Sequence, residues 1–463
     1  MLIVTALLLA ANLHNAVSAQ DNRVVPIDWK RFTVAYPNDA NAELQKAISK
    51  NAIKYAVNGW YKDAYGSQSA GEKYLDVLAT HAAYISPTEQ RIRGPAMQAQ
   101  SIATVIKLGL YDAAYTGVSE QGALDICAKL VRSVAKCHRA NFDGGWPRDD
   151  DWGAMWQGDF WAATAGLAGW QTWEQYNDTD KELIRKMVES EANRRMNYTV
   201  PYYRKKDGTI ATPGDSKAEE NAWNSNVLFL ACAMMPHHAN VDEWYKKAVE
   251  LAISAYASPN DINSDTIVNG KPLKDWLNGS NTEENYAVVN HNLIHPDYTA
   301  AHTLNLWNAA ILTLAGKPVP EGVFFNGDKV YRSLVTWNYP SPPYAAPGGT
   351  IYQPGNYEFY LPQGNDWGNF RYITHGAYSA EIHAYGLDTG LAHDGAYWEN
   401  LYSSRAKVLQ DRFDDGHMFK DNRENTYTLR EEQAAHENAK AILAKWTVRQ
   451  SGFKITKDKP KEK

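Results

Sequence analysis

Apolar residues recur with a helical period along most of the chain. Between Ala123 and Cys137, the apolar side chains are spaced so that they fall on one face of a helix. The same spacing recurs from Trp244 to Ala255 and from Leu304 to Leu314. This pattern predicts about thirteen helices, at 41–61, 69–85, 94–115, 119–141, 158–176, 179–197, 218–235, 240–257, 297–316, 327–338, 372–388, 396–413 and 429–450.

Signals for strands are few and short. Asp207-Gly208 and Asn269-Gly270 are each typical of the two-residue turn of a β-hairpin. Residues 336–369 are rich in proline, glycine and tyrosine without a period, which predicts a long ordered loop. The lysine-rich segment 454–463 is expected to be a disordered tail.

Helices joined by alternating short and long connections are typical of helical hairpins closed into a ring. We therefore predict an all-α fold, an (α/α)6 toroid in which loops at one end surround a central pocket. An open helical solenoid is the alternative, but the sequence shows no fixed repeat. No change of composition marks a second domain, so residues 20–453 are expected to form a single catalytic domain.

The first residues have the pattern of an export signal. An apolar run from Leu2 to Ala11 is followed by small residues before Ala19, which predicts a signal peptide at 1–19. No later stretch reaches the roughly 18 apolar residues of a membrane span. We expect a protein exported to the periplasm or extracellular space, without a membrane anchor, as a monomer or a weak dimer.

The amino-acid composition limits the classes of function that the protein can have. A net charge of −6 argues against a nucleic-acid partner, which requires a basic face. The chain has 16 Trp and 28 Tyr against 11 Phe, and aromatic rings with a polar edge suit a carbohydrate-binding cleft. The three cysteines, Cys127, Cys137 and Cys232, lie in apolar helical runs and are expected to be core thiols rather than a disulfide framework or a zinc site.

Two polar and aromatic clusters are candidates for binding a glycan. The first runs from Asp143 to Trp152 and contributes Trp146, Arg148 and Trp152; an acidic helix-capping loop is the alternative interpretation. The second runs from Gly214 to Asn226. Ser216 and Glu219 there are explained by a helix capping box, whereas Glu220, Asn221, Trp223 and Asn224 precede an apolar run and are expected to contact substrate.

Two further clusters are candidates for catalysis. Asn290 to Tyr298 holds His291, His295 and Tyr298 within nine residues. In the second cluster, Arg371, His375 and Tyr378 are spaced i, i+4 and i+7 and therefore share one helix face. These three residue types together are typical of a site that binds a carboxylate and transfers a proton. Tyr372 belongs to the same cluster, and Arg91 and Arg93 are further candidates for contacting an anion.

Motifs for cofactor chemistry are not found. The sequence has no nucleophile elbow, phosphate-binding loop, dinucleotide fingerprint or HExxH motif, so we expect no cofactor and no catalytic metal. The Asp149–Asp151 loop is still a candidate site for a structural or substrate-bridging calcium ion, because its carboxylates are oxygen ligands.

These residue types suit the β-elimination of a uronic acid glycan. A base removes the proton next to the carboxylate, which must be neutralised, and the sugar at C4 leaves. Tyrosine or histidine can be the base, and tyrosine needs nearby positive charge. Hydrolysis would instead need a pair of carboxyl groups, for which Asp149–Asp151, Asp159, Glu219 and Glu220 are available. A glycan-binding protein without catalysis is the third possibility.

An exported, Trp- and Tyr-rich chain of helical hairpins, in which Asn290-His291-Asn292 leads to Tyr298, resembles the toroidal (α/α) polysaccharide lyases. It is most similar to the L-rhamnose-α-1,4-D-glucuronate lyases of polysaccharide lyase family 27. That resemblance implies an (α/α)6 fold with a deep pocket and exo-acting removal of rhamnose caps from glucuronic acid in arabinogalactan.

The resemblance also implies roles for single residues. Asn224 would hold the carboxylate and His291 would neutralise it. Tyr298 would be the base, with Tyr372 or Tyr378 as rivals, and Arg371 would stabilise charge. The chain departs from the two-domain toroid lyases because it has no room for their large C-terminal β-sandwich, and its His291-to-Tyr298 spacing is shorter than theirs. A smaller, pocket-type enzyme fits these departures best.

Overall fold

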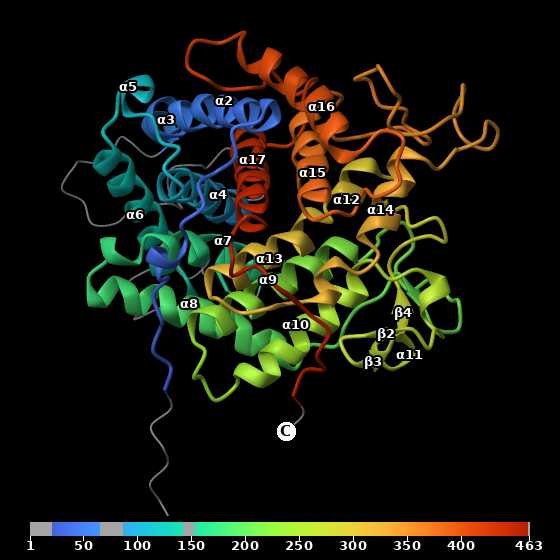
Figure 1. Cartoon of the computed structure of the whole chain (residues 1–463), viewed down its shortest axis with the longest axis horizontal. Helices are drawn as coiled ribbons and strands as arrows, with labels where there is room; N and C mark the ends of the chain where they lie inside the picture. The colour runs from blue at the N-terminus through green and yellow to red at the C-terminus, as the bar shows by residue number, and fades with distance from the viewer. Residues whose placement is uncertain (1–20, 65–86, 142–151, 154, 462–463) are drawn as a thin grey trace, which may run out of the picture.

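The computed structural model describes residues 21–64, 87–141, 152–153 and 155–461, which are mostly helical (Figure 1). The predicted all-α class is confirmed for this part of the chain. The expected signal peptide at 1–19 and the expected helix at 69–85 lie outside it. The helices are α2 (Ala40–Tyr55), α3 (Tyr61–Ala64), α4 (Pro87–Lys107), α5 (Ala113–Thr116), α6 (Glu120–Lys136), α7 (Gly158–Gln171), α8 (Asp178–Met196), α9 (Ala218–Met234), α10 (Val241–Ala255), α11 (Leu273–Trp276), α12 (Pro296–Ala300), α13 (Thr303–Leu314), α14 (Gly327–Val335), α15 (Tyr372–Ala384), α16 (Gly395–Gln410) and α17 (Arg430–Thr447).

Every strand of the described residues is two residues long. The hairpin predicted at Asn269-Gly270 is confirmed, with both turn residues at positive φ. At Asp207-Gly208 the turn forms a single bridge, Arg204 to Ile210, and β1 pairs instead with β4. The antiparallel pairs are β1 (Arg204–Lys205) with β4 (Gly279–Ser280), β2 (Ile267–Val268) with β3 (Lys271–Pro272), and β5 (Val289–Asn290) with β6 (Leu293–Ile294); β7 (Val319–Pro320) and β8 (Ile455–Thr456) are parallel.

The helices α7 and α13 are buried on every side. Helices that are apolar all round lie inside a protein rather than on its surface. Each contacts two other buried helices, so that α4, α7, α9, α13 and α17 follow one another and α17 returns to α4. In α7, Gly166 allows close packing, because a Cβ there would lie 2.6 Å from Val188 Cγ2 and 2.9 Å from Leu230 Cδ2.

Amphipathic helices pack outside this group. The apolar faces of α6, α8 and α10 lie against α4, α7 and α9, as the helical period predicts. On the other side, α15 packs on α13 and α17, and α2 and α16 pack over α17 and α15 (Figure 1). Residues 336–369 contain no helix and no strand beyond isolated bridges, in agreement with the predicted loop.

Two of the predicted helices, at 94–115 and 297–316, differ clearly from the helices observed there. The helix expected at 94–115 begins at Pro87, where proline is well suited to a first turn, and ends before Gly109, whose φ is 69°. The helix expected at 297–316 is divided into α12 and α13. Hydrogen bonds of the tighter i→i−3 kind, from His302 N to Thr299 O and from Leu304 N to Ala301 O, interrupt it.

The expectation of a disordered tail is wrong for its first residues. Val319 N donates to Lys454 O at 2.7 Å, and Ile455–Thr456 extends this contact as β8. All three cysteines are buried and free, which confirms them as core thiols. In the part of the chain that the structure describes, no helix has the length and apolar character needed to cross a bilayer.

Candidate functional site

A cavity of about 250 Å³ lies where six buried helices begin. Each of α4, α7, α9, α13, α15 and α17 contributes residues from its N-terminal half or from the residues just before it. From these six segments the cavity is lined by Glu89, Arg93, Met97, Trp156, Gln157, Phe160, Glu219, Trp223, Thr303, Leu304, Trp367, Arg371, Thr374, Gln433 and Glu437. The hairpin β5–β6 adds His291, and α12 adds Asp297 and Tyr298.

The common direction of these helices gives the cavity a positive bias. The N-terminal end of a helix carries about half a positive charge and presents backbone N–H groups without intrahelical partners. Anions are therefore stabilised at such ends. Helix ends from six elements, with Arg93 and Arg371, favour a negatively charged ligand and oppose the carboxyl groups that also line the cavity, Glu89, Glu219, Asp297 and Glu437.

The hairpin β5–β6 positions the histidines. Its turn is His291-Asn292, and both residues have positive φ, 52° and 63°. Asn292 N donates to Gly214 O and His291 N donates to Asn290 Oδ1, each at 2.9 Å, so the turn is held on both sides. The sequence analysis did not recognise this hairpin, because it contains no Asn-Gly or Asp-Gly pair.

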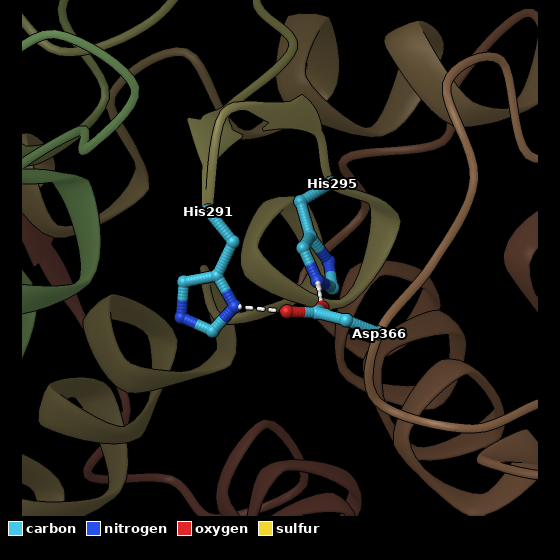
Figure 2. Close-up of side chains that lie close together, drawn as sticks. All are labelled: His291, His295 and Asp366. Carbon is cyan, nitrogen blue, oxygen red and sulfur yellow. Dashed lines mark hydrogen bonds and ion pairs between the residues drawn. The ribbon is translucent and has the colours of Figure 1, made fainter.

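A chain of hydrogen bonds runs from the cavity through His291. Tyr298 Oη lies 3.1 Å from His291 Nε2, and His291 Nδ1 lies 2.6 Å from Asp366 Oδ2. The other carboxylate oxygen of Asp366 lies 3.0 Å from Nε2 of the buried His295 (Figure 2). A carboxylate on Nδ1 favours the proton on that nitrogen, which leaves Nε2 free to accept from Tyr298.

Burial and nearby charges determine whether Tyr298 and Asp366, at the two ends of this hydrogen-bond chain, are protonated. Burial raises the pKa of Tyr298 well above its ordinary value, and the nearby Glu219 carboxyl adds to the effect. The phenol is therefore protonated at rest. Burial alone would raise the pKa of Asp366, but hydrogen bonds from His295 and His291 lower it, so this group stays a carboxylate.

Arg371 and His375 bind a carboxylate that belongs to the protein. Arg371 Nε donates to Asp297 Oδ1 at 2.7 Å, and His375 Nε2 lies 3.6 Å from the same atom. Burial would raise the pKa of Asp297, but Arg371 and His375 hold it far below its usual range. Arg371 and His375, which were predicted to bind a substrate carboxylate, are thus already engaged by Asp297, although Arg371 still lines the cavity.

Arg93, rather than Arg91, reaches the cavity. Its Nη1 donates to Glu89 Oε1 at 3.0 Å and to Gln157 Oε1 at 2.9 Å, and its guanidinium lies over the Phe160 ring. Among the described residues its buried Nε has no hydrogen-bond partner. Arg91 is buried and does not line the cavity.

Three tryptophans give the cavity an aromatic wall. Trp156 is 54% exposed, and its ring meets the edge of Trp223 at 5.4 Å between centroids. Trp367 stacks on His291 at 5.8 Å. The indole nitrogens of Trp223 and Trp367 are buried and have no acceptor within the described ranges.

Glu219 does not form the predicted capping box. Ser216 Oγ donates to Asn281 O, and Lys217 is the N-cap of α9 without a side-chain cap. The carboxyl of Glu219 instead lines the cavity and the adjoining opening that contains Glu220 and Asp215. Burial raises the pKa of Glu219 to about 8, against the opposing charge of Arg93.

This pKa predicts a pH-dependent effect of Glu219→Gln. The folded protein retains a proton that the unfolded chain releases above its ordinary pKa of 4.5, so the wild-type protein loses stability as pH rises from there toward about 8. Glutamine removes that loss. At about 1.4 kcal/mol per pKa unit, we expect the unfolding free energy of the variant relative to the wild type to rise by about 3–4 kcal/mol from pH 5 to pH 8, measured by denaturant unfolding at both values. An equal difference at both pH values would contradict the raised pKa.

Several predicted site residues lie away from the cavity. Asn221 Nδ2 cross-links helices through Pro201 O and Ser254 Oγ, Trp152 Nε1 donates to Val134 O, and Tyr378 Oη contacts His302 in the core. Tyr372 lines a separate groove. Asn224 and His375 are buried, and neither lines the cavity.

The remaining predicted residues lie at the cavity, at its opening or behind it, or fall outside the described residues. Tyr298, His291, Arg371 and Trp223 line the cavity, and Glu220 lines its opening. His295 supports the site through Asp366. Trp146, Arg148 and the Asp149–Asp151 loop lie outside the described residues.

The sequence analysis named Arg93 as an anion contact but missed Glu89, Gln433 and Glu437 in the lining. Glu89 and Arg93 on α4, and Gln433 and Glu437 on α17, are polar pairs four residues apart at the start of helices that then become apolar. That spacing places each pair on one helix face and was the available signal. Tyr427, which also lines the cavity, follows no helix pattern.

The site is a cavity at one end of a set of buried helices. It is lined by two arginines, Arg93 and Arg371, by aromatic rings and by a Tyr–His–Asp chain of hydrogen bonds. Comparison with models of protein families, with curated proteins and with solved structures finds no match for this chain.

Proposed function

We propose that this protein is a polysaccharide lyase that cleaves a glycosidic bond at C4 of a uronic acid by β-elimination. The observation that carries the proposal is the Tyr298–His291–Asp366 chain, which opens into a cavity built at six helix N-termini. It combines a proton-transfer group with surroundings that favour a carboxylate.

The proton transfers follow from this chain. Tyr298 Oη takes the proton from C5 of the uronate while its own proton passes to His291 Nε2, and Asp366 stabilises the imidazolium that forms. The electron pair left at C5 forms the C4=C5 double bond as the C4–O bond breaks. Tyr298 donates its acquired proton to the leaving oxygen, and His291 returns a proton to Tyr298. All groups then regain their starting states.

Charge on the substrate carboxylate must be stabilised as C5 loses its proton. Arg93 supports this role because it carries a positive charge and lines the cavity. The Glu219 carboxyl, with its pKa raised to about 8, is protonated near neutral pH and can donate a hydrogen bond to the same group. These two residues take the place that the sequence analysis assigned to Asn224 and Arg371.

An (α/α)6 toroid is the architecture we propose for this helical fold. It is supported by the contacts that connect α4, α7, α9, α13 and α17 in a cycle, with α15 against α13 and α17. The starts of these six helices all line one cavity.

The substrate we propose is glucuronic acid capped by rhamnose in arabinogalactan, cut from the chain end. The cavity with its aromatic wall supports exo action, and the apolar N-terminal segment supports export. We propose a monomer or a weak dimer, with no nucleic-acid partner.

Trp156→Ala tests sugar binding at the mouth of the cavity. Loss of ring stacking of about 1.4 kcal/mol corresponds to a tenfold rise in KM, with kcat changed little. Steady-state kinetics on the responsive glycan measure both. Trp337→Ala is the matched control, because Trp337 is 47% exposed and does not line the cavity. Equal KM values for the two variants would contradict a role for Trp156.

A glycoside hydrolase is the second candidate function. Glu219 favours it, because a carboxyl with a raised pKa at a cavity wall can be a general acid. Glu219→Gln would then abolish activity, whereas in a lyase it weakens carboxylate stabilisation and reduces the rate only in part.

The experiment for the proposed function is low-ultraviolet absorbance during incubation with uronate-bearing glycans, including gum arabic. Rising absorbance reports the C4=C5 double bond conjugated to the carboxylate and supports the lyase. New reducing ends without an absorbance change would contradict it and support the hydrolase.

A further inference from the structure

We propose that His291, His295 and Asp366 form a binding site for a divalent transition metal ion such as Zn²⁺, and that an ion bound there stops the proton transfer to His291. One ligand atom of each side chain lies within 4.8 Å of the others. Both imidazole rings are directed at the carboxylate of Asp366 (Figure 2).

The donor types select the class of metal. Two imidazoles and one carboxylate suit Zn²⁺, Co²⁺ or Ni²⁺ better than Mg²⁺ or Ca²⁺, which prefer oxygen ligands. Three protein ligands leave a fourth position for water or another molecule. His291 lines the cavity and the side chain of Asp366 is 50% exposed, so an ion can enter from solvent.

The backbone brings the ligands close to the required separation. Ligand atoms about 2.0–2.1 Å from a tetrahedral ion are about 3.3 Å apart. Here His291 Nδ1 and Asp366 Oδ2 are 2.6 Å apart, and His295 Nε2 and Asp366 Oδ1 are 3.0 Å apart. His291 lies in the turn of β5–β6 and His295 directly follows β6, so the backbone holds both imidazoles beside Asp366, with ligand atoms within 4.8 Å of one another.

Residues behind the ligands add charge and packing. The Asp297 carboxylate lies 3.9 Å from Nδ1 of the buried His295, beyond hydrogen-bond distance, and Arg371 fixes Asp297 in turn. Trp367 stacks on the His291 ring. A carboxylate close to a metal-binding imidazole favours a bound cation by its negative charge.

An ion on His291 Nδ1 moves the imidazole proton to Nε2. That nitrogen then donates to Tyr298 Oη and cannot accept the phenol proton. This inhibitory consequence rests on the proposed function, whereas metal binding itself does not.

Isothermal titration of the purified protein with ZnCl₂, without glycan, tests the site. We expect one ion per chain for the wild type, with affinity reduced at least about 100-fold in His295→Ala and in Asp366→Asn. His383→Ala is the matched control, because His383, Asp388 and Asp394 form the other such group in the described residues. Circular dichroism checks that each variant is folded.

The outcomes separate the two proposals. Equal Zn²⁺ affinity in the wild type and both ligand variants, or a loss confined to His383→Ala, would overturn the site. If the wild type also degrades a uronate glycan, Zn²⁺ is expected to slow it at least tenfold and a chelator to restore the rate; an unchanged rate at saturating Zn²⁺ would overturn the inhibition. Binding that depends on His295, in a protein without turnover, supports the metal site and counts against the lyase.

Discussion

Tyr298→Phe is expected to reduce the rate of uronate elimination by about 10³–10⁴-fold. Phenylalanine retains the ring in the cavity but removes the oxygen that takes the C5 proton and then protonates the leaving group. The contact with His291 Nε2 is lost with it. The rate of absorbance increase, with thermal unfolding of the same sample, measures the effect.

Tyr378→Phe is the matched control for this variant. Tyr378 is a predicted rival for the base, but it is fully buried beside His302 and does not line the cavity. We expect its activity to lie within about threefold of the wild type, in the range of a small stability change. Full activity of Tyr298→Phe, or its loss only in Tyr378→Phe, would show that the base is misassigned.

Arg371→Met is expected to lower the free energy of unfolding by about 3–5 kcal/mol near pH 7. Asp297 and Arg371 are both buried, at 8% and 4% exposure, so the variant leaves a buried carboxylate without its main counter-charge. Denaturant unfolding followed by circular dichroism measures the change. Adding Asp297→Asn should restore more than half of the loss, because the two residues are coupled.

Arg423→Ala provides the control for a charge pair in solvent. Arg423 pairs with Asp421 at 2.7 Å, but its side chain is 86% exposed. Exposed pairs contribute between 0 and about 1 kcal/mol. Similar effects of the two arginine variants would contradict the role of burial at Arg371.

The helices could be predicted because their period is local information. The segments at 119–141, 218–235 and 240–257 match α6, α9 and α10 to within a few residues at each end. The division between α12 and α13 could not be predicted from the sequence, because it depends on two i→i−3 hydrogen bonds rather than on the apolar pattern.

Pairings between distant residues explain most errors at the site. The spacing of Arg371 and His375 correctly indicated a carboxylate, but their partner is Asp297, 74 residues from Arg371 in the chain. Ser216 Oγ donates to Asn281 O and accepts from Ala218 N rather than from Glu219 N, so no capping box forms and Glu219 lines the cavity. Asn221, which was predicted to contact substrate, instead connects α9 to α10 and to the loop at Pro201. Local clusters identified His291 and Tyr298, and the fold decided which charges face them.

The most direct test of β-elimination is the mass of the product formed from a rhamnose-capped glucuronate oligosaccharide in H₂¹⁸O. We predict an unsaturated uronate product that is one water molecule lighter than the hydrolysis product and carries no ¹⁸O. The released rhamnose should carry none at its new hydroxyl beyond exchange in a control without enzyme. A saturated uronate product without ¹⁸O, together with rhamnose that carries one ¹⁸O at C1 per bond cleaved beyond the exchange control, would contradict the account and identify a hydrolase.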